Sequence, residues 1–160
     1  MSIFTPATSR QSDVALTILR VVTGVTFLAH GAQKVFVMGV GNVSNGFAHM
    51  GVPLPGVMGP LIAFLELFGG IALIVGLLTR LAGFGLLLDM LGAIMLVHLK
   101  NGFFLPSGYE FVLLLAAASA ALMVAGAGAF SIDGLLARRS GERAGYNAST
   151  ANTGSRRAAA

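Results

Sequence analysis

The feature that most constrains this chain is an apolar stretch of 25 residues that also carries ionisable side chains. It runs from Val14 to Met38, VALTILRVVTGVTFLAHGAQKVFVM. A bilayer core of about 30 Å requires about 20 apolar residues in a helix, so this stretch is long enough to cross a membrane. Its polar members are Arg20, His30, Gln33 and Lys34. A charge at the membrane centre costs at least ~2.5 kcal/mol, so each of these groups has to be paired, hydrated or extended to the interface.

The composition places the chain among membrane proteins. Hydrophobic residues make up 56% and charged residues 10%, whereas soluble domains carry about 25% charged residues. The 160 residues contain 22 glycines, which suit helices that approach each other closely. There is no cysteine, which excludes disulfides, thiol redox chemistry and cysteine-ligated iron–sulfur or zinc sites in this chain.

Hydropathy predicts an all-α fold, a transmembrane four-helix bundle that occupies residues 14–133 as one domain. The predicted spans cover residues 14–38, 57–78, 81–99 and 109–126. Each is close to the ~20 residues that a membrane helix needs.

The remaining segments are predicted to lie outside these spans. Residues 1–13 form a polar N-terminal segment, and residues 134–160 form a basic, flexible cytoplasmic tail. Residues 39–56 are predicted as a loop at the membrane interface, because Pro53, Pro55 and the glycines beside them break helices.

The basic residues predict an orientation. Four spans place both termini on one side, and eight of the ten Lys and Arg residues lie towards that side. They are Arg10, Arg20, Arg80, Arg138, Arg139, Arg143, Arg156 and Arg157. Lys34 and Lys100 lie towards the other side. Because cytoplasmic segments are enriched in Lys and Arg, both termini are predicted to be cytoplasmic, and nucleic acid is not expected as a partner.

Polar side chains gather at the predicted outer membrane level. The candidate ligand-binding residues are His30, Gln33, Lys34, His98, Lys100, Tyr109 and Glu110. Simpler interpretations exist, because lysines near helix ends extend to the interface and a tyrosine there belongs to the aromatic belt. Glu110 either caps the fourth helix or pairs with Lys34 or Lys100.

A second group of charges lies deeper. Arg20, Glu66 and Asp89 are predicted to form a buried charge cluster between helices. One arginine cannot neutralise two carboxylates, so either one acid is protonated or it pairs with an outer basic group. The cluster is either a structural ion pair that fixes helix order or a proton relay. No metal site is predicted, because the three histidines lack ligand spacing, and no covalent cofactor motif is present.

Five sequence blocks occur in an order and spacing typical of one family. They are LRVVTGVTFLAHGAQKVF (19–36), GFAHMGVPLPG (46–56), ELFGGIALIVGLLTRLAG (66–83), HLKNGFF (98–104) and GYEFVLLLAAA (108–118). On these blocks the chain resembles the DoxX family of small four-helix integral membrane proteins.

The resemblance implies a redox-linked membrane subunit with a polar pocket at the outer level that binds quinone or a small anion. The family includes a membrane subunit of an archaeal thiosulfate:quinone oxidoreductase. Any enzyme activity would therefore be that of a quinone-linked complex, not of this chain alone. The implied partners are the lipid bilayer of a prokaryotic inner membrane and other membrane or membrane-associated subunits. The alternative is a non-catalytic accessory subunit that packs on a larger membrane complex.

Overall fold

The computed structural model describes residues 6–140 of the chain, and these residues are helical or in turns, without a strand. The elements are α1 (Ser9–Ala32), η1 (Gln33–Met38), α2 (Val40–His49), α3 (Pro55–Val75), α4 (Thr79–Ala93), η2 (Ile94–His98), η3 (Leu99–Asn101) and α5 (Glu110–Ala125). η1 and η2 are π-helical continuations of α1 and α4. The prediction of an all-α membrane fold is confirmed.

Three helical runs are long and apolar enough to cross a membrane. They are Ser9–Met38, Pro55–Val75 and Thr79–Asn101. The fourth apolar helix, α5, has 16 residues, which corresponds to about 24 Å. The three long runs begin two to five residues before the predicted spans. The second run ends three residues before its predicted end, and α5 is one residue shorter than its predicted span at each end.

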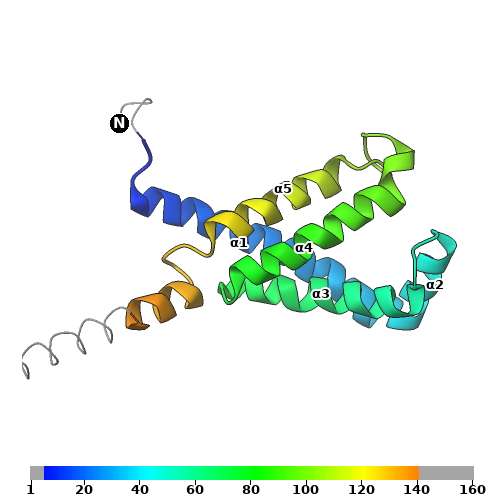
Figure 1. The fold of residues 1–160 in the computed structure, drawn as a ribbon, viewed down its shortest axis with the longest axis horizontal. Coiled ribbons are helices and arrows are strands. Elements are labelled where there is room, and N and C mark those ends of the chain that lie inside the picture. The colour runs from blue at the N-terminus through cyan, green and yellow to red at the C-terminus, as the bar shows by residue number, and fades with distance from the viewer. Residues whose placement is uncertain (1–5, 141–160) are drawn as a thin grey trace, which may run out of the picture.

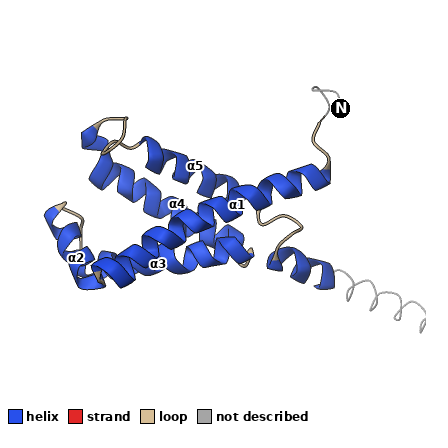
Figure 2. Ribbon diagram, turned by 180° about the vertical axis from the view of Figure 1, so that it is seen from behind, coloured by secondary structure: helices blue, strands red, loops and turns tan. Residues whose placement is uncertain are grey.

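The helices form two antiparallel pairs. α1 packs along α3, and α4 packs along α5. The two pairs cross near the middle of the molecule and diverge towards the end that carries α2 and the α4–α5 connection (Figures 1 and 2). The start of α1 and the short helix at 132–140 lie at the opposite end (Figure 1).

Glycines allow α1 and α3 to touch through their backbones. A Cβ atom on Gly31 would lie 2.6 Å from the Cα of Leu67, and one on Gly70 would lie 2.5 Å from the backbone nitrogen of Leu28. In lipid there is no hydrophobic driving force between helices, so they associate through close van der Waals packing, which small residues allow. These contacts fix the register of the two helices, with Gly31 opposite Leu67.

Helix α2 lies within the segment that was predicted as a loop, so that prediction is wrong for residues 40–49. The helix begins after Gly39, which has φ 79°, and ends before Gly51, which has φ 78°. Val43 is 3% exposed, and a Cβ on Gly59 of α3 would lie 2.9 Å from the Cα of Ser44. Glycine and asparagine cost a helix at most ~1 kcal/mol per residue relative to alanine. Packing on α3 therefore outweighs their low helix propensity.

The predicted flexible tail falls largely on residues 141–160, which lie outside the described residues. The part that is described forms the helix at 132–140.

Candidate functional site

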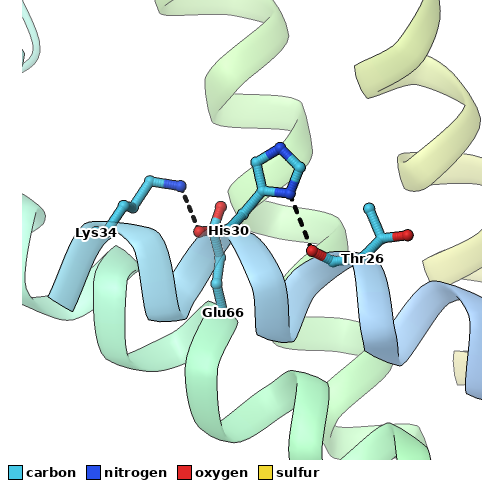
Figure 3. Close-up of polar contacts among 4 residues, drawn as sticks. All are labelled: Thr26, His30, Lys34 and Glu66. Carbon is cyan, nitrogen blue, oxygen red and sulfur yellow. Dashed lines mark hydrogen bonds and ion pairs between the residues drawn. The ribbon is translucent and has the colours of Figure 1, made fainter. Parts of the chain in front are cut away.

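A salt bridge between two membrane helices forms the centre of the candidate site. Lys34 Nζ, in η1, donates to Glu66 Oε2, in α3 (Figure 3). The two side chains are 20% and 5% exposed. It is the only salt bridge within residues 6–140. Pairing offsets part of the cost of placing these two ions in hydrocarbon.

The register of α1 and α3 explains why these two residues meet. Gly31 contacts the backbone of Glu66 and Leu67 directly. Because helix side chains lean towards the N-terminus of their own helix, Lys34 reaches back over the turn that contains Gly31. Its ammonium group therefore lies against the carboxylate of Glu66.

Asp89 of α4 adds a second carboxyl group beside this pair. It is 8% exposed, and its Oδ2 atom is buried with no hydrogen-bond partner among the described residues. α3 and α4 contact each other where Gly69 meets Leu86, which brings the turn that carries Asp89 next to the turn that carries Glu66. Three helices thus bring together two carboxyls and one ammonium group.

His30 lies one turn before Lys34, at the exposed side of the bundle. Its Nδ1 is 2.9 Å from the carbonyl oxygen of Thr26 (Figure 3). A carbonyl only accepts, so Nδ1 carries the proton and Nε2 is the acceptor of the neutral ring. The ring centroid lies 6.2 Å from that of Phe111 on α5. Gln33, three residues further along α1, is also exposed.

Two of the predicted outer residues stabilise the connection between α4 and α5. His98 Nδ1 lies 2.9 Å from the carbonyl oxygen of Ser107. The backbone nitrogen of Leu105 donates to Glu110 Oε1 at 2.8 Å. Both side chains therefore bind the backbone of the loop that precedes α5.

The other two outer residues do not join His30 either. Tyr109 packs edge-on against Phe103, with ring centroids 5.3 Å apart, and Lys100 is exposed. The alternative in which Glu110 pairs with Lys34 or Lys100 does not occur, because Lys34 binds Glu66 and the Glu110 carboxylate accepts from the backbone of Leu105. The candidate residues therefore do not form one site. Lys34 belongs to the buried charged group, His30 lies on the exposed side of the bundle, and His98 and Glu110 bind the loop before α5.

Arg20 lies away from both carboxyls, so the predicted cluster of Arg20 with Glu66 and Asp89 does not form. Its Nη1 donates to the carbonyls of Leu73 at 2.6 Å and Ile74 at 2.7 Å. Its Nη2 donates to the carbonyl of Phe130 at 2.9 Å. The reason is again the antiparallel register, which places Arg20 opposite the last turn of α3 and not opposite its middle.

Asp133 lies outside every predicted site, yet it connects three segments. Its carboxylate accepts from the backbone nitrogens of Leu78 and Thr79, both at 2.9 Å. Its own backbone nitrogen donates to Gly76 at 2.9 Å. An anion thus caps the start of α4 while the Arg20 cation binds the end of α3, as the helix dipoles favour. In the sequence, the only indication of this role is that Asp133 stands beside Gly134 just after the last apolar span.

A groove on the outer face of α3 has a volume of about 460 Å³. It is lined by Pro60, Leu61, Phe64, Leu65, Phe68 and Gly69. None of the predicted site residues contributes to it, and its apolar lining suits contact with lipid.

Comparison with known proteins places these residues in a family context. The family model described as DoxX matches residues 15–99, a range that includes His30, Lys34, Glu66 and Asp89. No solved structure is significantly similar to the chain.

The relatives of the chain include three bacterial proteins. "Putative oxidoreductase CatD" of Bacillus subtilis (strain 168) is 34% identical over 114 residues, which is 71% of this chain and 82% of the relative. "Inner membrane protein YqjF" of Escherichia coli (strain K12) is 33% identical over 139 residues, 79% of this chain and 95% of the relative. "Uncharacterized membrane protein Rv3486" of Mycobacterium tuberculosis (strain ATCC 25618 / H37Rv) is 35% identical over 85 residues, 51% of this chain and 50% of the relative.

Proposed function

The chain belongs to the DoxX family of membrane proteins, and from this premise we propose that it is the membrane subunit of a quinone-linked redox system. One observation carries the proposal: the Lys34–Glu66 salt bridge, with Asp89 beside it, lies inside helices that span the membrane. Ionisable residues at such depth are costly and mark ligand or proton sites. The name of the Bacillus relative supports a redox role.

The quinone headgroup would bind at the exposed side of α1, near His30. A quinone ring requires an apolar surface and hydrogen-bonding partners for its oxygens. Phe111 supplies the surface, and His30 and Gln33 supply polar groups on the same side of the pair. When neutral, His30 accepts a hydrogen bond at Nε2, and when protonated it donates one there. It can therefore take up or release a proton at the bound oxygen.

A bound quinone would supply two-electron chemistry, and this chain would bind the headgroup and hold protons. Cysteine-based electron carriers have to come from a partner, because the chain contains no cysteine. We propose a prokaryotic inner membrane as the location, which the name of the Escherichia coli relative supports. Other membrane or membrane-associated subunits would be its partners.

A quinone titration tests this proposal. The purified full-length chain in detergent is titrated with ubiquinone-1, a short-tailed quinone, by isothermal titration calorimetry. His30→Ala should weaken binding about tenfold, which corresponds to the loss of one hydrogen bond of about 1.4 kcal/mol. His49→Ala, an exposed histidine on α2, is the matched control and should bind as the wild type does.

Two results would overturn the proposal. One is the absence of any binding by the folded wild-type chain, which would favour the non-catalytic accessory subunit. The other is equal loss of affinity in both histidine variants, which would show that His30 has no specific part.

A further inference from the structure

The buried group of Lys34, Glu66 and Asp89 does not balance in charge. With all three ionised it would carry one net negative charge. Glu66 lies eleven residues after Pro55 and nine before Val75, so it sits at mid-helix. Asp89 lies ten residues after Thr79 and also sits near the middle of its span. A net charge at this depth is among the least favourable arrangements in a membrane protein.

No other cation among the described residues is placed to balance the group. From α1 and η1, the ionisable residues that face it are Lys34 and, on the exposed side, His30, whose Nδ1 is bonded to Thr26. α3 contributes Glu66 and α4 contributes Asp89. The one acid of α5, Glu110, binds the backbone of Leu105. Arg20 is held by carbonyls at the other end of α3.

We propose that Glu66 and Asp89 share one exchangeable proton, and that with Lys34 they form a charge-neutral proton-binding site inside the membrane. Asp89 Oδ2 is buried and has no partner among the described residues. Gly69 of α3 lies against Leu86 of the next helix, α4. Glu66 lies three residues before Gly69 and Asp89 three residues after Leu86, so the two carboxyl groups lie on facing turns of antiparallel helices. Two carboxylates can only accept hydrogen bonds, whereas one proton turns one of them into a donor to the other. The same proton cancels the excess charge.

This inference deepens the proposed function, because a quinone takes up protons when it is reduced. His30, one turn from Lys34 and exposed, is the group through which the proton would reach the outer surface of the bundle. The proton site itself needs no quinone, so its test can be made without one.

Infrared difference spectroscopy of the full-length chain in liposomes at neutral pH provides the test. A protonated carboxyl gives a carbonyl stretch that shifts in D₂O, and the wild type should show it. Asp89→Asn and Glu66→Gln should each abolish the band, because the one remaining carboxylate then pairs with Lys34. Lys34→Met should raise the band about twofold, because both carboxyls then have to be neutral. Asp13→Asn is the control, since Asp13 binds the backbone of Ala129 near the start of α1.

The gain of signal in Lys34→Met keeps the test decisive even where a loss variant folds poorly. Absence of the band in the wild type, or its persistence in both Asp89→Asn and Glu66→Gln, would overturn the proton site. A normal band together with a failed quinone titration would leave the proton site standing and remove the quinone proposal.

Discussion

Arg20 shows how a charge inside a membrane helix can be structural. Its guanidinium group satisfies two carbonyls in the last turn of α3 and one in the segment after α5. The last carbonyls of a helix have no partner within that helix, and the cation also complements the helix dipole. Arg20 is 2% exposed, so these contacts are not shared with water.

Replacement of Arg20 by methionine should therefore destabilise the protein strongly. Methionine keeps an unbranched apolar chain at this position, but three carbonyls lose the guanidinium as a donor, and the expected cost is about 3 kcal/mol. Thermal unfolding in detergent, followed by circular dichroism, measures it. Arg10→Met removes an exposed arginine of α1 and should leave the unfolding temperature unchanged. Equal stability of the two variants would show that the carbonyl contacts contribute little.

The polar residues of the site were visible in the sequence, but their partners were not. Lys34, Glu66 and Asp89 stand out because ionisable groups are rare in apolar spans. Whether Glu66 met Arg20 or Lys34 depended on the register of α1 and α3, which is fixed by backbone contact at Gly31. Hydropathy does not predict the register of two packed helices. Hydropathy does not single out Asp133, because this residue lies beyond the last span.

At the scale of elements, the α1–α3 interface depends on the absence of side chains. Gly24, Gly31 and Gly70 lie along the line of contact, and a Cβ at any of them would meet the backbone of the other helix. Overpacking in such a place costs typically 1–3 kcal/mol. The same contact also positions Lys34 against Glu66.

Gly31→Ala should therefore both destabilise the chain and disturb the salt bridge. We expect a loss of at least about 1–3 kcal/mol, because the new methyl group would meet backbone that cannot move aside. Gly92→Ala in α4 is the matched control, since a Cβ there meets nothing within 4 Å. Thermal unfolding of both variants measures the difference. A Gly31→Ala variant as stable as Gly92→Ala would contradict the close approach of α1 and α3.

The helices themselves differ in how well their sequence predicts them. The three long runs follow directly from hydropathy, and Pro60 within α3 does not interrupt the helix. Helix α2 could not be predicted in this way, because its Gly and Asn residues indicate a loop, and its packing against α3 and η1 stabilises the helix. Local propensity is a weak guide where tertiary packing decides.

For the whole molecule, the positions of the arginines predict its orientation. Asp133 and Asp13 tie the start of α4, the start of α1 and the segment after α5 together at one end. Arg10, Arg80 and Arg138 belong to these segments, so we expect this end to face the cytoplasm.

The absence of cysteine allows this orientation to be tested with single introduced thiols. Asn45→Cys, exposed on α2, should react with a membrane-impermeant maleimide on intact cells. Ser140→Cys, at the other end, should react only after the membrane is opened. The reverse pattern would invert the orientation, and with it the side from which His30 is reached.

The short length of α5 has a consequence for the lipid around it. The first helical run has 30 residues and α5 has 16, so the two helices have to meet the same bilayer in different ways. A long helix is accommodated by tilting, whereas a helix as short as α5 is expected to thin the bilayer around it. Phe111 is the second residue of α5 and faces His30, so water and phosphate groups come closest to the buried charges where the bilayer is thinnest.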